Sequence, residues 1–336
     1  MDKTAVILVN VGTPDSPSVT DVRKYLSQFL NDRRVIDLPW LLQKILVNLI
    51  IVPFRAPKSA KLYQQLWSEK GSPLLHYSQS VTAKLQLRMG AKWQIFNAMR
   101  YGQPELDKVL EQIKYKAFNK IVILPLFPQY ASATTGTVFQ SVLSQISRWN
   151  TMPEVQMINH FHDHKAFIDA FALQAAKYMG HHWDHILFSF HGLPLRQINK
   201  VHPEHNCEEC LCKTEKIAEG KLCYQAACYE TARLISHKSG ISPENYSVTF
   251  QSRLTKNWMS PFTDKVLIQK AKEGIKNILV FAPSFVADCL ETKIEIEKDY
   301  LQLFRENGGE NLQLVESLND HDFWIGSLEQ IIKSEA

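Results

Sequence analysis

The segment KIVILPLF (120–127) is an almost continuous apolar run bounded by Asn119 and Pro128. A short run of this kind, without polar alternation, is typical of a parallel strand that is buried on both faces of a sheet. Seven more segments have the same character: 5–10, 93–99, 155–161, 185–190, 247–252, 277–283 and 312–317. We therefore expect eight buried strands, four in each half of the chain.

Helix-length patterns separate these strands. PELDKVLEQIKYKAF begins at Pro104, a favourable residue in a first helical turn, and AFIDAFALQAAKYMG ends at Gly180. Strands that alternate with helices in both halves predict an α/β protein with two open parallel sheets in tandem. We place the two domains at residues 1–162 and 163–336, with a C-terminal helix that can pack back on the first domain.

The composition narrows the class of protein. The chain has 336 residues, of which 45% are apolar and 21% charged, with a formal net charge of +4. The charges are spread along the chain, which argues against nucleic-acid binding. The N-terminal apolar run is too short for a signal-peptide core, and no run reaches the roughly 18 apolar residues of a membrane span. We expect a cytoplasmic protein.

Ligands of open parallel sheets bind beyond the carboxyl ends of the strands. Four strand ends carry distinctive residues: LPLFPQYASATTG (124–136), FSFHGLP (188–194), TFQSRLTKNWMSPFTD (249–264) and FAPSFVADCLE (281–291). In the second of these, Gly192 frees the backbone after His191 and Pro194 stiffens the loop. Although a lone histidine is often structural, an imidazole here suits proton transfer or metal binding.

Carboxylates follow the last of these strand ends. If a helix starts near Asp288, then Asp288, Glu291, Glu295 and Asp299 lie on one of its faces, because they are three, four and four residues apart. This row is either a solvated acidic face or a path that carries divalent cations or protons to a closed site.

The three motifs FSFHGLP, TFQSR…W…P.TD and FVADCLET, in this order and spacing, resemble those of ferrochelatases. Four N-terminal segments are similar as well: LVNVGTPDSP…VRKYLSQFLNDRRVIDLP, GSPLLHYSQ (71–79), MRYGQP (99–104) and LPLFPQYASATTG. The resemblance covers nearly the whole chain. It implies two Rossmann-like domains with a porphyrin cleft between them. It also implies a lyase that inserts Fe2+ into protoporphyrin IX, giving protohaem in the last step of haem biosynthesis. The resemblance does not distinguish protoporphyrin from coproporphyrin as the substrate.

The resemblance further implies that His191 and Glu291 face each other across the bound macrocycle. Because metal insertion releases two pyrrole protons, the pair must divide metal holding and proton acceptance. We expect His191 to accept the protons and to serve as a metal ligand with Glu291 as its partner, although the reverse division stays open. Glu295 and Asp299 would continue the acidic path.

Six other residues match the family at positions expected to contact substrate: Tyr130 and Trp258 as aromatic walls, Arg100 and Tyr101 as substrate-binding residues, and Arg33 and Arg34 as further partners of the propionates. The segment PWLLQKILVNLIIVPF (39–54) matches an apolar lip at the cleft mouth, and we expect it to contact the inner membrane peripherally. The alternative is an ordinary core helix. Polar interruptions make the segment too short to span a bilayer.

An insert at residues 202–228 contains five closely spaced cysteines: Cys207, Cys210, Cys212, Cys223 and Cys228. Such thiolates suit zinc or an iron–sulfur cluster. The stretch CYQAAC resembles the segment that carries a [2Fe–2S] cluster in some ferrochelatases, with zinc and redox thiols as alternatives. Cys289 occupies a position where some members have histidine, and we expect an inert thiol there.

Two other functions compete with a ferrochelatase. One is a chelatase for another tetrapyrrole, such as a cobalt-inserting enzyme, and the other is a non-catalytic haem or iron–sulfur sensor. The full-length resemblance and the apolar lip count against the first, and the His191/Glu291 pair counts against the second.

Overall fold

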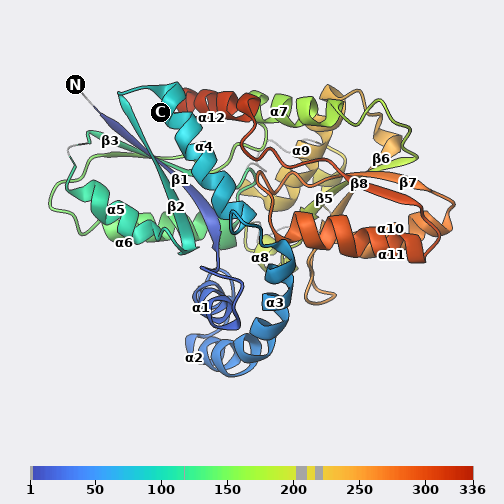
Figure 1. Cartoon of the computed structure of the whole chain (residues 1–336), viewed down its shortest axis with the longest axis horizontal. Helices are drawn as coiled ribbons and strands as arrows, with labels where there is room; N and C mark the ends of the chain where they lie inside the picture. The colour runs from blue at the N-terminus through green and yellow to red at the C-terminus, as the bar shows by residue number, and fades with distance from the viewer. Residues whose placement is uncertain (1–2, 117, 202–209, 216–221, 336) are drawn as a thin grey trace. The chain divides into compact units, whose positions relative to one another are not determined.

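The computed structural model describes residues 3–116, 118–201, 210–215 and 222–335. It contains two four-stranded parallel sheets flanked by helices (Figure 1), which confirms the predicted fold class and the eight strands. The chain divides into two compact units. Unit 1 comprises Met1–Phe127, Ala131–Asn159 and Asn319–Ala336, and unit 2 comprises Pro128–Tyr130 and His160–Leu318.

The sheet of unit 1 has the order β2-β1-β3-β4. Its strands are β1 (Thr4–Thr13), β2 (Trp93–Gly102), β3 (Lys120–Pro125) and β4 (Glu154–Met157). Consecutive residues of β1 from Ala5 to Val9 are almost fully buried, because helices cover both faces of the sheet. On one face, Ile7 and Val9 pack in a cluster with α5 (Leu106–Lys114) and α6 (Thr137–Ile146).

Two other helices complete the layers of unit 1. The helix α4 (Pro73–Met89) contacts β1 and β2, and α12 (Asp322–Glu335) packs on α4. Arg88 of α4 forms an ion pair with Glu329 of α12. The C-terminal helix α12 therefore belongs to unit 1, as the N-terminal strand β1 does.

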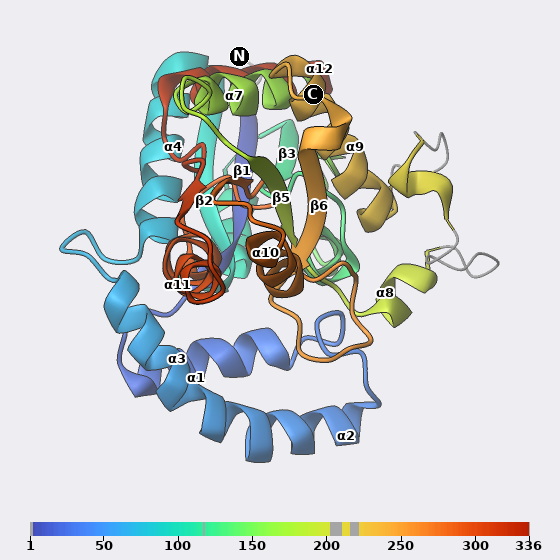
Figure 2. The same cartoon turned by 90° about the vertical axis from the view of Figure 1, so that its right-hand side faces the viewer.

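A helical arm lies beyond the carboxyl end of β1 in unit 1 (Figures 1 and 2). It consists of α1 (Val19–Leu30), followed by α2 (Trp40–Ile45), the π-helix η1 (Leu46–Ile51) and α3 (Val52–Leu66), and α1 packs on α3. The last three elements form one helix of 27 residues, Trp40–Leu66, which by length and composition alone could cross a membrane. The apolar segment 39–54, which is too short by itself to span a bilayer, is thus part of a longer helix. Its polar residues do not interrupt the helical backbone.

The sheet of unit 2 has the order β6-β5-β7-β8. Its strands are β5 (His185–His191), β6 (Tyr246–Gln251), β7 (Asn277–Phe281) and β8 (Asn311–Leu314). One face packs against α10 (Thr263–Lys272), the π-helix η6 (Glu291–Tyr300) and α11 (Leu301–Glu306), in a cluster that includes Leu187, Val280 and Phe304.

The other face of this sheet is rich in aromatic residues. Two helices that contact each other lie on this side, α7 (Lys165–Ala176) and α9 (Tyr224–Lys238) (Figure 2). Tyr229 of α9 contacts Phe250 of β6, with ring centroids 6.2 Å apart. Short helices occupy the connections: η2 (Ser132–Gly136), α8 (Leu195–Asn199), η3 (Leu211–Lys213) and η5 (Pro243–Asn245).

Candidate active site

His191 is the last residue of β5, at the carboxyl end of the sheet in unit 2. Its ring lies near Trp258 and Phe285, with centroid distances of 6.5 and 6.4 Å. Its Nδ1 atom is 2.7 Å from the carbonyl oxygen of Gly192. Because a carbonyl oxygen only accepts hydrogen bonds, Nδ1 carries the proton, and the neutral ring has its lone pair on Nε2. This nitrogen can take a proton or bind a metal ion.

The loop after His191 positions Trp258. The amide of Gly192 donates to the carbonyl oxygen of Gln251 at 2.8 Å, and the amide of Met259 donates to the carbonyl oxygen of Leu193 at 2.9 Å. A Cβ atom at Gly192 would lie 3.0 Å from the Gln251 oxygen and 3.6 Å from the indole of Trp258. Glycine thus lets the indole approach the backbone next to the imidazole.

Tyr224 forms a hydrogen bond with the backbone of His191. Its hydroxyl donates to the carbonyl oxygen of His191 at 2.8 Å and lies 3.2 Å from Oγ of Ser284. Burial raises the pKa of the Tyr224 hydroxyl well above its ordinary value, so this group remains a donor. Tyr224 directly follows Cys223, and the cysteine-bearing segment is therefore joined to the backbone of His191. In the sequence, CYQAAC is distinctive for its thiols, and no pattern there indicates that Tyr224 reaches His191.

Glu291 belongs to the same unit as His191. It is the half-buried first residue of η6, which follows β7, and β7 pairs directly with β5. The connection from β7 to η6 passes beside His191, because Phe285 of this connection contacts the imidazole. Burial and the nearby Glu291 carboxylate raise the pKa of the Cys289 thiol well above its ordinary value. Cys289 is therefore a protonated thiol at neutral pH.

The helix that carries the acidic row differs from the one expected to start near Asp288. Glu291 is the first residue of η6, which is a π-helix, whereas Asp288 lies before the helix, is 7% exposed and accepts a hydrogen bond from Oγ1 of Thr292 at 3.3 Å. A spacing of four residues is compatible with either helix type, so the sequence did not reveal the wider turn. Asp299 is exposed, near the far end of η6.

Glu295 is the most strongly hydrogen-bonded member of this row. Its carboxylate accepts from Nε2 of Gln251 at 3.2 Å, from the Ser252 amide at 3.0 Å, from the Ser252 hydroxyl at 2.5 Å and from the Tyr300 hydroxyl at 2.8 Å. Ser252 adopts a left-handed conformation with φ of 62°, which is uncommon for a residue other than glycine. Burial and the Glu295 charge raise the pKa of Tyr300. Glu295 thus joins η6 to the end of β6.

Arg100 and Tyr101 lie on β2 in unit 1 and share Asp32, a partner that no sequence pattern indicates. The Asp32 carboxylate accepts from Nη2 of Arg100 at 2.8 Å and from the Tyr101 hydroxyl at 3.0 Å. Burial and this carboxylate raise the pKa of Tyr101.

The other residues expected to contact substrate in this part of the chain lie elsewhere in the connections. Arg34 donates to Oγ of Ser132 at 2.9 Å, and Arg33 is exposed. Tyr130 is half-buried in the connection that follows β3.

Four of the five insert cysteines lie in the described part of the chain, and Cys207 lies outside it. Among the described cysteines there is no disulfide. The amide of Cys212 lies 3.5 Å from Sγ of Cys210, and burial followed by the effect of neighbouring Cys210 raises the pKa of Cys212 to about 12. Burial also raises the pKa values of Cys223 and Cys228, and neighbouring thiols add to the effect. These buried thiols are therefore protonated at neutral pH in the structure as described.

A family model and several curated proteins match this chain over most of its length. The ferrochelatase family model matches residues 3–336. A ferrochelatase of Legionella pneumophila (strain Lens) is 40% identical over 331 residues, covering 98% of both chains. A ferrochelatase of Coxiella burnetii (strain Dugway 5J108-111) is 39% identical over 339 residues, covering 99% of this chain and 94% of the relative.

Solved structures support the fold. The structure of SirB from Bacillus subtilis with Fe3+ is similar over 99% of this chain and 96% of its own, with a TM-score of 0.57 and 11% sequence identity. A second similar structure is the sirohydrochlorin chelatase SirB from Bacillus subtilis subspecies spizizenii in complex with cobalt, with a TM-score of 0.55 and 10% identity over 99% of this chain and 95% of its own. The family match over almost the whole length decides the assignment: this chain is a member of the ferrochelatase family.

Proposed function

We propose that this protein inserts Fe2+ into protoporphyrin IX and releases two protons, which gives protohaem in the last step of haem biosynthesis. Membership of the ferrochelatase family supports metal insertion into a porphyrin as the activity. The observation that carries the proposal furthest is the fixed tautomer of His191, whose Nδ1–H donates to the Gly192 carbonyl and leaves the Nε2 lone pair available.

The chemistry requires a proton acceptor, because a free-base porphyrin loses two pyrrole protons when a dication takes their place. His191 accepts the two protons one after the other at Nε2 and passes the first on to water or to the carboxylate path before it takes the second. While its Nε2 lone pair is free, His191 can instead ligate the incoming metal, with Glu291 as its carboxylate partner. Trp258 and Phe285 provide aromatic surface beside the imidazole, which suits contact with a flat macrocycle. Glu295 and Asp299 continue the carboxylate path, with Glu295 also holding β6.

Substrate contacts away from the metal come from the matched residues of the family. Tyr130 and Trp258 serve as aromatic walls, and Arg100 with Tyr101 forms a polar substrate-binding group. Because the Arg100 guanidinium is already paired with Asp32, it binds a propionate only as part of this group.

The helix Trp40–Leu66 suits a peripheral contact of a cytoplasmic protein with the inner membrane. Several large apolar residues between Trp40 and Phe54 are exposed, including Trp40 at 60%, Leu49 at 69% and Phe54 at 73%. Such a surface can enter the interfacial region of a bilayer and receive an apolar porphyrin.

We also propose that the insert cysteines hold a [2Fe–2S] cluster. Four thiolates are needed, and Cys223 and Cys228 together with two of Cys207, Cys210 and Cys212 would supply that number. Visible absorption bands together with equal amounts of iron and sulfide in protein purified without oxygen would support the cluster. Colourless protein without iron from the same preparation would contradict it.

The activity is tested by anaerobic incubation of the full chain with Fe2+ and protoporphyrin IX while the absorption spectrum is followed. We expect His191→Ala to abolish the spectral change, because the proton acceptor is lost, and His181→Ala, an exposed histidine of the same unit, to retain it. Full activity of His191→Ala would refute the role of this residue. Turnover of sirohydrochlorin with Co2+, but not of protoporphyrin with Fe2+, would favour the competing tetrapyrrole chelatase.

A further inference from the structure

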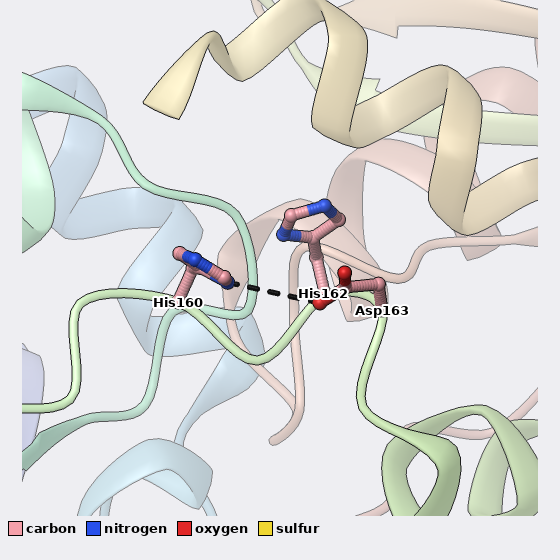
Figure 3. Close-up of side chains that lie close together, drawn as sticks. All are labelled: His160, His162 and Asp163. Atoms are coloured by element: carbon pink, nitrogen blue, oxygen red, sulfur yellow. Dashed lines mark ion pairs between the residues drawn. The ribbon is translucent and has the colours of Figure 1, made fainter. Parts of the chain in front are cut away.

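The segment immediately before α7 in unit 2 brings two imidazoles and a carboxylate together. The ligand atoms that His160, His162 and Asp163 offer all lie within 4.8 Å of one another. The Nδ1 atom of His160 is 3.7 Å from an Asp163 oxygen, and the ring centroids of the two histidines are 5.0 Å apart. In Figure 3, His160 and Asp163 point toward each other, and the ring of His162 lies above them. None of these residues belongs to the His191 site.

Phe161 anchors the backbone between the two histidines. It is 2% exposed, and its amide donates to the carbonyl oxygen of Pro128 at 3.0 Å. This anchor holds the segment that carries both imidazoles, whose ring centroids are 5.0 Å apart.

A turn then adds the carboxylate. The amide of His164 donates to the carbonyl oxygen of Phe161 at 3.1 Å, which reverses the chain and returns Asp163 toward His160. His164 itself caps α7, because its Nδ1 atom accepts from the Ala166 amide at 3.2 Å. The turn is thus held at both ends.

In this cluster His162 is buried, whereas His160 and Asp163 are partly exposed to solvent. His162 is 3% exposed, and its carbonyl oxygen accepts from Oγ1 of Thr231 in α9 at 3.4 Å. The side chains of His160 and Asp163 are 18% and 25% exposed. An ion can therefore reach the cluster from solvent while one ligand is held by the packed interior.

The donor set indicates the class of ion. Two imidazoles and one carboxylate with open positions form a set that binds Fe2+ and related first-row dications. Ligands about 2.0–2.2 Å from one tetrahedral metal lie roughly 3.3–3.6 Å apart. The 3.7 Å separation of His160 and Asp163 is close to this value, and small side-chain rotations bring in His162.

We propose that His160, His162 and Asp163 form a second binding site for a divalent first-row transition-metal ion such as Fe2+. The site goes beyond the insertion reaction, because it binds the ion without porphyrin and uses none of the residues assigned to that reaction. The Asp163 carboxylate supplies negative charge, and the imidazoles supply the nitrogen ligands.

The test uses Co2+ alone as the probe and the full chain carrying His191→Ala and Glu291→Gln, which removes the proposed insertion site. Bound Co2+ per chain is measured by equilibrium dialysis. Adding His160→Ala or Asp163→Asn should remove one bound Co2+ or weaken its binding at least about tenfold. Adding His181→Ala should change nothing. Because all variants share the same cysteines, thiolate-bound cobalt cancels in the comparison.

Thermal unfolding gives an independent readout that also checks the fold. Co2+ should raise the Tm of the background protein more than that of the Asp163→Asn variant, because an ion that binds the native state stabilises it. Equal numbers of bound Co2+ and equal Tm shifts in all variants would overturn the proposal. Since no porphyrin is present, failure of the insertion activity does not affect this result.

Discussion

At the scale of single residues, the surroundings of His191 determine what its ring can do. The Gly192 carbonyl selects the tautomer, and the Tyr224 hydroxyl donates to the His191 carbonyl. The ring and the backbone of His191 are thus both restrained, which favours a constant position of Nε2. Small displacements of a reacting group can cost large factors in rate.

Replacement of Tyr224 tests this restraint. Tyr224→Phe removes only the hydroxyl and leaves the His191 carbonyl without this donor. We expect kcat to fall between about threefold and 100-fold, with KM nearly unchanged, and the free energy of unfolding to fall by about 1–3 kcal/mol. Steady-state kinetics and urea unfolding measure both. Tyr229→Phe, on the same helix, should alter kcat little, and an equal loss in both variants would exclude a positioning role for Tyr224.

His185, the first residue of β5, provides a prediction on pH. Burial lowers the pKa of this imidazole from 6.5 to about 4, and Lys270 contributes to the shift. Between these values the unfolded chain binds a proton that the folded chain does not, so stability is lost as the pH falls from about 6.5 to about 4. His185→Gln should flatten this part of the stability profile in urea titrations, whereas exposed His182→Gln should not. Identical profiles for the His185 variant and the original protein would contradict the assignment.

At the scale of elements, the π-helix η6 and the end of β6 depend on one carboxylate. Glu295 accepts from Gln251, Ser252 and Tyr300, and the left-handed backbone of Ser252 directs its amide to this carboxylate. These hydrogen bonds fix the position of Glu295 in η6 relative to the end of β6. Glu295 is therefore structural as well as a member of the proposed path.

Substitution of Glu295 should reveal this structural role. Glu295→Ala leaves several donors near the protein interior without an acceptor, and we expect the free energy of unfolding to fall by about 2–4 kcal/mol. Glu297→Ala on the same helix removes a partly exposed ion pair with Lys293 and should cost less than about 1 kcal/mol. Equal losses in urea unfolding would show that Glu295 does not hold β6.

At the scale of the whole molecule, unit 1 contributes an exposed apolar helix and unit 2 contributes the imidazole and the acidic helix. Phe54 and Leu49 are among the most exposed apolar residues described in unit 1. Exposed apolar residues gathered on one helix indicate an interaction surface more strongly than scattered ones do. The proposed membrane contact therefore lies on unit 1, whereas the residues proposed for the insertion chemistry, His191 and Glu291, lie on unit 2.

Vesicle binding tests this division of roles. Leu49→Ser with Phe54→Ser should lower co-sedimentation with anionic phospholipid vesicles several-fold, because two apolar side chains no longer enter the interface. Insertion into a water-soluble porphyrin should be retained. Leu87→Ser, at an 85% exposed position of α4, serves as the control and should bind vesicles as the original protein does. Unchanged sedimentation of the double variant would contradict membrane contact through this helix.

Much of the fold could be predicted from the sequence. The eight strands were recognisable because strands covered on both faces require continuous apolar runs, and in β1 and β5 nearly every residue is buried. His191 was recognisable because it occupies the carboxyl end of such a run. By contrast, carboxylates spaced four apart suit both an α-helix and a π-helix, so the geometry of η6 could not be inferred.

The amino-acid sequence by itself determined the strand pattern, the chemistry at the strand ends and the family. The tertiary structure alone decided which partners restrain those side chains. Tyr224 meets His191, Asp32 meets Arg100, and Asp163 returns toward His160. The physical reason is that burial periodicity is a local property of the chain, whereas these contacts depend on where turns and distant helices place a side chain in space.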